Sequence, residues 1–215
     1  MTTRRRIICS ILSAGVLSAC ALFNHATPER VVRVKLLADV AFRARNPEWQ
    51  SEARGLIEAT SDYYEREFNI RLVSQNVAAW PERERMSSTP QLLSRLQKDF
   101  SAPSADYDVI VAFSGENVSR YLTAGRPRVD RVGECIRGLS QYMIVPTAKI
   151  FRYGGLNREP EPDVITLIHE FGHVFGAEHV DDNQSLMHEN YGYRTEFDAK
   201  NRAAIVKNKF CLFAK

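Results

Sequence analysis

Histidine is scarce in this chain, and its few copies are crowded together. Five of the 215 residues are histidines, and four of these lie between residues 169 and 188. Internal repeats and low-complexity tracts are missing as well, which excludes a solenoid or a largely disordered chain. We therefore expect a globular protein whose chemistry is concentrated beyond residue 168.

The chain also has little net charge once its first residues are set aside. Residues 1–19 contain three arginines and no acidic residue, so 26 of the 29 basic residues remain against 26 acidic ones. The excess of basic residues that nucleic acid binding requires is therefore missing. We expect no nucleic acid partner, and we expect a monomer.

The start of the chain has the layout of an export signal. Three arginines at positions 4–6 precede an apolar stretch over residues 7–19 that is too short to span a bilayer comfortably. At its end, Leu17-Ser18-Ala19-Cys20 resembles a bacterial lipobox, which implies cleavage before Cys20 and a lipid on its sulfur. An ordinary cleaved signal is the alternative, and a twin-arginine signal is a weaker one.

This interpretation predicts the division of the chain and its location. We expect residues 1–19 to be a signal peptide, residues 20–30 a lipidated tether and residues 31–215 a single domain. The lipid would hold the domain at the bacterial cell envelope, on the periplasmic or outer-membrane face. Membrane contact is thus expected through Cys20.

Four cysteines are few, and this interpretation leaves two of them to pair. Cys9 lies in the predicted signal, and Cys20 would carry the lipid. In an oxidising compartment Cys135 and Cys211 could form one disulfide, which would stabilise the fold by about 4 kcal/mol. Two independent buried thiols are the alternative, because a sequence does not show proximity.

Hydrophobic periodicity predicts alternating strands and helices in the first half of the chain. β-Branched residues predict a strand at 31–37, and further strands are expected at 69–75 and 108–113. Apolar residues at helical spacing predict a long helix at 47–68 and a second one with Thr89 as N-cap. The continuous apolar run at 108–113 suits a strand that is buried on both faces.

The second half is predicted to contain a long loop, two short strands and two helices. The loop is expected over 114–131, and the strands over 132–136 and 142–145. A buried helix follows Asp163, which can cap its first turn, and a closing helix spans 195–207. This order predicts the fold class α+β, or mixed α/β: a twisted mixed sheet of about five strands packed by long helices.

Eleven residues in and after the buried helix have the pattern of a metal site: His169-Glu170-Phe171-Gly172-His173-Val174-Phe175-Gly176-Ala177-Glu178-His179. His169 and His173 are one helical turn apart, so both imidazoles can bind one cation. Continued helix would carry His179 about 9 Å along the axis and away from that cation. The helix must therefore end, and Gly176 is suited to end it because glycine adopts left-handed conformations without strain.

These residues and those that follow resemble the metzincin zinc metallopeptidases. H-E-x-x-H-x-x-G-x-x-H is followed by Ser185-Leu186-Met187-His188, which looks like the methionine turn of that group. Met187 follows His179 by eight residues, a gap similar to that of matrixins, although Val180 departs from the known subfamilies and leaves the subfamily unassigned. The resemblance implies a small C-terminal part built from the methionine turn and the closing helix.

The resemblance also implies how a substrate is held. Metzincins carry an antiparallel edge strand beside the cleft, and the segment 132–137 is our candidate for it. An extended peptide or protein segment can add to such an edge as one more strand. A surface turn near the disulfide is the alternative for this segment.

We therefore predict a zinc-dependent endopeptidase with His169, His173 and His179 as metal ligands. Three neutral imidazoles on one Zn²⁺ leave a fourth position for water, whose acidity the metal increases. Glu170 would accept a proton from this water and pass it to the leaving amine. The alternative is a non-catalytic, membrane-tethered zinc-binding lipoprotein. Glu170 speaks against it, because a structural site needs no carboxylate beside an open coordination position.

Three residues after the methionine turn are candidates for further contacts. Glu189 lies two residues after Met187, where related enzymes carry a tyrosine near the metal, so its carboxylate could approach the zinc. A solvated turn residue is the alternative. Tyr191 and Tyr193 could offer a phenol to the developing oxyanion, or could pack against the closing helix.

Overall fold

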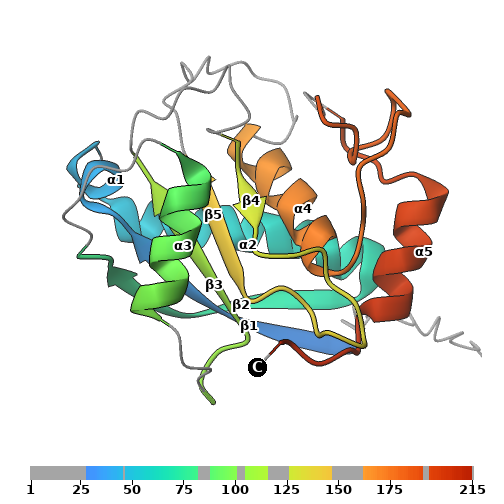
Figure 1. The fold of residues 1–215 in the computed structure, drawn as a ribbon, viewed down its shortest axis with the longest axis horizontal. Coiled ribbons are helices and arrows are strands. Elements are labelled where there is room, and N and C mark those ends of the chain that lie inside the picture. Colours follow the sequence, from blue (N-terminus) through green and yellow to red (C-terminus); the bar gives the residue numbers. More distant parts are fainter. Residues whose placement is uncertain are drawn as a thin grey trace, which may run out of the picture.

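The computed structural model describes residues 28–45, 47–81, 88–100, 105–115, 126–146, 162–190 and 194–214. The predicted signal peptide and Cys20 lie outside these residues. The elements, labelled in Figure 1, are β1 (Arg30–Ala38), α1 (Val40–Arg45), α2 (Trp49–Phe68), β2 (Ile70–Ala79), α3 (Thr89–Asp99), β3 (Val109–Ser114), β4 (Arg128–Val129), β5 (Tyr142–Pro146), α4 (Pro162–Val174) and α5 (Ala199–Asn208). Among the described helices, none combines the length and the apolar character needed to cross a membrane.

The strands form one mixed sheet in the order β2-β1-β3-β5-β4. The first four of these strands are parallel to one another, and β4 is antiparallel to β5 at the edge. The predicted fold class is therefore confirmed. Because the parallel strands need long crossover connections, helices come to lie on both faces of the sheet.

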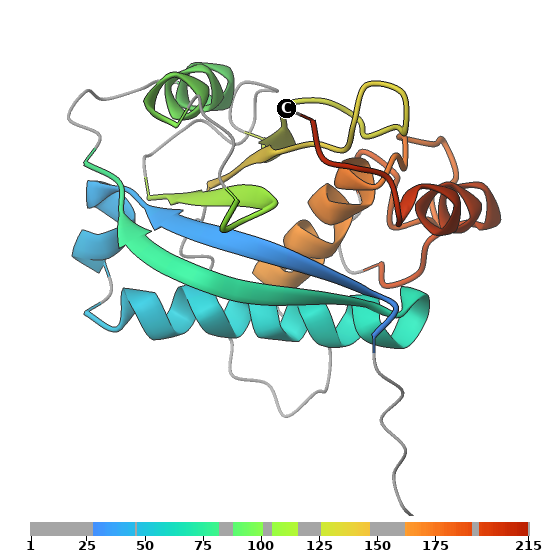
Figure 2. The ribbon, with the colours of Figure 1, turned by 90° about the horizontal axis from the view of Figure 1, so that it is seen from below.

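Strand β3 separates two apolar cores. Every residue of this strand is buried, with Val109, Val111 and Phe113 on one face and Ile110 and Ala112 on the other. Helices α2 and α4 pack on the first face, and α3 packs on the second, as Figure 2 shows for α2 and α3. Because successive side chains of a strand point to opposite faces, alternate residues of β3 pack against the helices on one face or the other.

Tyr64 joins the long helix α2 to helix α4. Its ring is buried against Phe171 and Phe175, and its hydroxyl donates a hydrogen bond to the carbonyl of Ile168 at 2.8 Å. The burial of these rings and the satisfied hydroxyl hold α4 in place against α2. The helix predicted at 47–68 is therefore present, and it supports the element that carries the candidate metal ligands.

The antiparallel edge strand lies at Arg128–Val129, so our placement of it at 132–137 is wrong. The strand predicted at 132–136 is a turn closed by a bridge between Glu134 and Gly138, which is the alternative that we considered. The predicted loop at 114–131 contains β4 and is therefore too long.

Asp130 explains why the edge strand stops so early. Its Oδ1 accepts hydrogen bonds from the backbone N–H groups of Gln141 and Tyr142, each at 3.0 Å, and from the hydroxyl of Ser140 at 2.6 Å. The N–H groups of Gln141 and Tyr142 at the start of β5 thus pair with the side chain of Asp130, and not with a longer β4. Beyond this point the chain turns, and Gly133 N–H donates to the carbonyl of His173 at 2.9 Å.

Several helices begin at other residues than predicted. Helix α2 begins at Trp49 and not at residue 47, and helix α4 begins at Pro162, so Asp163 lies inside its first turn. Helix α3 includes Thr89, with Ser88 in the N-cap position, one residue earlier than expected. Helix α5 begins at Ala199, because Asp198 caps it by accepting a hydrogen bond from the N–H of Asn201 at 3.0 Å. The predicted closing helix is therefore shorter than 195–207 at its start.

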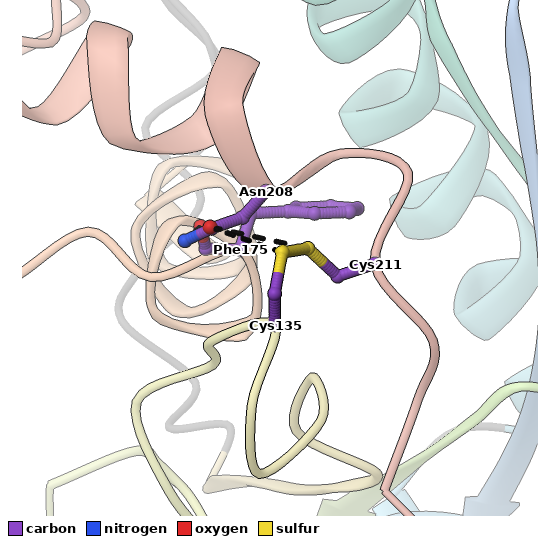
Figure 3. Close-up of a disulfide and its surroundings, with 4 residues drawn as sticks. All are labelled: Cys135, Phe175, Asn208 and Cys211. Carbon is purple, nitrogen blue, oxygen red and sulfur yellow. Dashed lines mark hydrogen bonds between the residues drawn. A yellow bond between two sulfur atoms is a disulfide. The ribbon is translucent and has the colours of Figure 1, made fainter.

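A disulfide joins Cys135 in the turn to Cys211 after helix α5, with a Cα–Cα distance of 4.9 Å (Figure 3). Asn208 lies beside it, and its Nδ2 donates a hydrogen bond to the carbonyl of Phe175 at 3.1 Å. The bridge thus ties the C-terminal segment to the end of α4, where the candidate metal site begins.

Candidate metal centre

Helix α4 presents His169 and His173 on one buried face. The side chains lie one turn apart, and His169 is 2% exposed and His173 8% exposed. The rest of the helix is surrounded by core residues, because Val164, Ile165, Leu167, Ile168, Phe171 and Val174 are buried. Tight packing of the helix therefore restricts where both imidazoles can point.

The helix ends in a turn that Gly176 makes feasible. The N–H of Gly176 donates to the carbonyl of His173 at 3.0 Å, and the N–H of Ala177 donates to the carbonyl of Gly172 at 2.9 Å, which is the bond pair of a Schellman motif. Gly176 has a φ of 93°, and a Cβ at this position would lie 2.6 Å from the carbonyl oxygen of Gly133. Glycine is needed on both counts, and the chain then turns back to His179.

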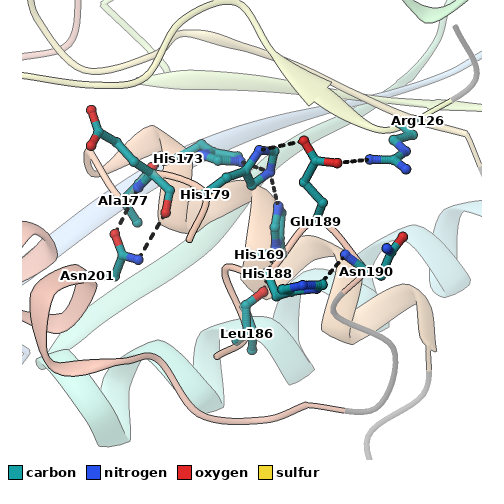
Figure 4. Close-up of polar contacts among 11 residues, drawn as sticks. Arg126, His169, His173, Ala177, His179, Leu186, His188, Glu189, Asn190 and Asn201 are labelled. Atoms are coloured by element: carbon teal, nitrogen blue, oxygen red, sulfur yellow. Dashed lines mark hydrogen bonds and ion pairs between the residues drawn. The ribbon is translucent and has the colours of Figure 1, made fainter. Parts of the chain in front are cut away.

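The Nε2 atoms of the three histidines converge (Figure 4). Nε2 of His179 lies 3.2 Å from Nε2 of His169 and 3.2 Å from Nε2 of His173. A tetrahedral zinc ion with Zn–N bonds of about 2.0–2.1 Å holds its ligand nitrogens about 3.3 Å apart. One zinc ion therefore fits this arrangement. Over the part of the chain that the structure describes, no other cluster of histidine, cysteine or carboxylate ligands could hold a metal.

Backbone carbonyls set the tautomer of the two helical histidines. Nδ1 of His169 lies 2.7 Å from the carbonyl oxygen of Leu186, and Nδ1 of His173 lies 2.8 Å from that of Ala177. Because a carbonyl oxygen can only accept, each Nδ1 must carry the proton. Each Nε2 then presents a lone pair to the centre, as a metal ligand must.

The imidazoles are neutral at physiological pH. Burial lowers the pKa of His169 to about 3, with a further contribution from the neighbouring His173. Burial likewise lowers the pKa of His173 to about 4, and it lowers the pKa of the half-exposed His179. Neutral rings do not have to lose a proton before they bind a cation.

Glu170, which follows His169 in helix α4, is also buried. It is 3% exposed, burial raises its pKa to about 8, and the charge of Arg128 opposes that rise. Its Oε2 has no hydrogen-bond partner among the described residues. A buried polar atom without a partner is unfavourable, so the site is suited to a polar ligand such as water held by a cation. A divalent cation nearby would also lower the pKa of this carboxyl group.

Met187 is buried against helix α4. The residue is fully buried, and its sulfur would lie 3.0 Å from a Cβ placed on Gly172, between the two helical ligands in the sequence. The N–H of Met187 donates to Ser185 Oγ at 3.0 Å, and its carbonyl accepts from the N–H of Val180 at 3.1 Å. The methionine turn is thus bonded to the chain just after His179.

Glu189 lies behind the third ligand and not on its metal-facing side. Its Oε1 is 4.0 Å from Nδ1 of His179, the ring nitrogen that does not face the other histidines. Its Oε2 is 3.3 Å from Nη1 of Arg126, a residue that the sequence patterns did not single out. The structure therefore does not bring Glu189 to the metal-facing nitrogens. Tyr191 and Tyr193 lie outside the described residues.

The fold is a mixed sheet with an antiparallel edge strand, and three histidines converge after the end of helix α4. This arrangement suits a metallopeptidase. The model of the metallo-peptidase family M12, Reprolysin_5, matches residues 28–203. The chain belongs to this family.

Comparison with solved structures agrees with the fold. Archaemetzincin from Methanopyrus kandleri is similar with a TM-score of 0.54 and 16% sequence identity, over 87% of this chain and 98% of the other. At this identity the likeness concerns the fold alone. No curated protein matches the chain. The matrixin-like interpretation of the short spacing stays a prediction.

Sequence patterns did not single out two residues at the start of helix α5 that support the segments around the centre. Asp198 and Asn201 contact the segments next to His179 and Met187. An aspartate directly before a helical stretch is an N-cap signal and could have indicated Asp198. No comparable local signal exists for Asn201, because its partner Glu178 is 23 residues away.

Proposed function

We propose that this protein is a zinc-dependent endopeptidase of the metzincin type. One observation carries the proposal: three Nε2 atoms converge, and the residue after the first of these histidines, Glu170, is a buried carboxyl group whose Oε2 has no partner among the described residues. A purely structural zinc site is closed by four protein ligands, whereas a catalytic one has three and leaves a position for solvent. His169, His173 and His179 are the proposed ligands.

Glu170 is the proposed catalytic residue. A zinc ion, when bound, would increase the acidity of a water molecule and polarise the scissile carbonyl. Glu170 would accept a proton from this water as the water oxygen bonds to the carbonyl carbon. It would then donate the proton to the amide nitrogen as the C–N bond breaks.

The proposed substrate is a peptide or protein segment in extended conformation. Strand β4 is the sheet edge next to the centre, because it contacts α4 and its Arg128 acts on the pKa of Glu170. An extended segment that pairs with β4 would lie along this edge of the sheet, on the side from which Arg128 acts on Glu170. Backbone pairing of this kind holds many sequences, which suits an endopeptidase.

Incubation of the protein with a mixed peptide library tests this function. We expect cleavage that a chelator abolishes and that added zinc restores. Intact peptides in the presence of stoichiometrically bound zinc would favour the non-catalytic zinc-binding lipoprotein instead. The cleaved positions would also give the preferred side chains around the scissile bond.

We propose, in addition, that the protein is exported and lipid-anchored at Cys20. The sequence of residues 4–20 supports this location, and the disulfide between Cys135 and Cys211 suits an oxidising compartment. Metabolic labelling with a fatty acid tests it. We expect label on the full chain and none on the Cys20→Ala variant, whereas equal labelling of both would contradict lipidation at this position.

A further inference from the structure

Asn201 of helix α5 forms hydrogen bonds with the backbone of Glu178, the residue that precedes His179. It is 1% exposed, and its Oδ1 accepts a hydrogen bond from the N–H of Glu178 at 2.8 Å. Its Nδ2 donates to the carbonyl of the same Glu178 at 3.0 Å. Figure 4 shows Asn201 beside the segment that leads from Ala177 to His179. One side chain thus satisfies both backbone groups of a single residue, much as a neighbouring strand would.

Asp198 orients this asparagine and connects it to the methionine turn. Its Oδ1 accepts from the N–H of Asn201 at 3.0 Å, and its Oδ2 accepts from Asn201 Nδ2 at 2.7 Å. The same Oδ2 accepts from the hydroxyl of Ser185 at 2.6 Å, and Ser185 Oγ in turn accepts from the N–H of Met187 at 3.0 Å. The helix N-cap therefore ties the segment before His179 to the methionine turn.

The third ligand needs this support more than the other two. His169 and His173 belong to a regular helix, and each has Nδ1 bonded to a backbone carbonyl. His179 follows the helix, its side chain is 45% exposed, and among the described residues its Nδ1 faces only the exposed carboxylate of Glu189 at 4.0 Å. The place of its Nε2 therefore depends on the backbone from Ala177 to Val180.

We propose that Asn201, held by Asp198, is a positioning residue that sets His179 for metal binding. Asn201 does not touch the converging ring nitrogens, and it acts through the backbone of Glu178. The proposal rests on the zinc site proposed above. Outer residues that orient metal ligands typically contribute 10- to 100-fold to metal affinity.

The test compares Asn201→Ala with Ser61→Ala in the full chain. Ser61 is a matched control, because it is a buried side chain that accepts one hydrogen bond, from the N–H of Leu72 at 2.9 Å, on helix α2 away from the centre. Zinc affinity is measured by competition with a chromophoric chelator. Ligand number is measured from the visible spectrum of the cobalt-substituted protein. Unfolding of the metal-free forms measures the loss of stability.

We expect the Asn201→Ala variant to bind zinc about 10- to 100-fold more weakly, with a cobalt spectrum that reports loss of one histidine. The Ser61→Ala variant should lose stability but keep the wild-type affinity and spectrum. Unchanged affinity and spectrum in Asn201→Ala, together with lower stability, would overturn the positioning role and leave a structural one.

A second variant keeps the test decisive if Asn201→Ala does not fold. Asn201→Asp retains an acceptor for the N–H of Glu178 but loses the donor to its carbonyl and repels Asp198. We expect weaker zinc binding here also, with partial recovery when Asp198→Asn is added, since the new amide restores a donor between the two side chains. No recovery would count against the proposed contact. Absence of zinc binding in the wild type would instead refute the zinc site itself.

Discussion

The helix-borne ligands and the third ligand reach the same point by different means. His169 and His173 are buried, and the period of helix α4 places them together. His179 is half exposed and depends on a glycine turn and on the side chain of Asn201. A helix can thus bring two histidines together by local geometry, whereas the third histidine requires contacts between distant segments. Substitutions at each kind of position test this difference separately.

The largest effect is expected at Glu170, on the helix side of the centre. Replacing Glu170 with glutamine keeps the shape but removes the group that accepts and donates the proton, so kcat should fall by about 10²- to 10⁴-fold. Zinc content should stay at the wild-type level. Peptide cleavage assays and metal analysis measure the two quantities.

Glu178→Gln is the matched control from the other side of the comparison. Its side chain is 63% exposed and pairs with Lys200 at the surface. We expect kcat within about two-fold of the wild type, because an exposed ion pair contributes little. Equal losses in both variants would contradict the assignment of Glu170 as the proton carrier.

The next largest effect is expected at Gly176, in the turn between the helical histidines and His179. Gly176→Ala would place a Cβ 2.6 Å from a backbone carbonyl oxygen, at a φ of 93°, and we expect a loss of about 2–4 kcal/mol in unfolding free energy. Zinc affinity should fall as well, because the turn delivers His179. Denaturant unfolding and chelator competition provide the measurements.

Gly55→Ala on helix α2 is the control glycine. A Cβ there meets no atom within 4 Å, so alanine should stabilise the helix by about 0.5–1 kcal/mol. If Gly176→Ala were equally harmless, the chain would have another way to reverse after α4. The role of Gly176 in presenting the third ligand would then be wrong.

The pH dependence of the metal-free protein should reflect the burial of the helical ligands. His169 and His173 have a pKa of 6.5 when exposed and of about 3 and 4 when folded, so the unfolded state binds more protons below pH 6.5. Each contributes stability that is lost as the pH falls, at about 1.4 kcal/mol per pH unit. Glu170 opposes this slope, because its pKa rises from 4.5 to about 8 on folding. Its stabilising effect is lost as the pH rises towards 8.

These opposing contributions predict a maximum of stability near pH 6.5, with a net rise of about 1.4 kcal/mol per unit between pH 4.5 and 6.5 and a decline above it. Unfolding in denaturant at several pH values measures the curve. His173→Asn should flatten the lower limb more than substitution of the half-exposed His179, and Glu170→Gln should remove the decline. A monotonic curve in the wild type would show that these groups are solvated in the folded protein.

The same contrast explains what the sequence could predict. The spacing of His169 and His173 and the glycine after them follow local rules, and the apolar pattern predicted β3 and its two buried faces. The edge strand was misplaced because Asp130 pairs with backbone groups 11 and 12 residues away. No local pattern signals such a contact, so only the folded chain shows where β4 ends.

Residues around the third ligand were missed for the same reason. Asn201 and Arg126 lie far from His179 in sequence, and neither belongs to a motif of its own. A polar residue on an amphipathic helix is ordinarily expected to face solvent. Asn201 contacts Glu178 because the chain turns back after Gly176 and brings Glu178 to helix α5. That contact depends on the tertiary fold and not on a local pattern.

The smallest effect is expected at Glu189, the group behind the third ligand. Its carboxylate is 61% exposed and lies 4.0 Å from Nδ1 of His179, so the interaction is weak and screened by solvent. Glu189→Gln should weaken zinc binding by no more than about five-fold at low salt, and the difference should vanish at high salt. Arg126→Ala, which removes the partner of Glu189, should change the affinity in the same small range. A loss beyond about ten-fold that persists in salt would mean that this carboxylate closes on His179 when the metal binds. The third ligand would then be supported from both sides, as the helical ligands are.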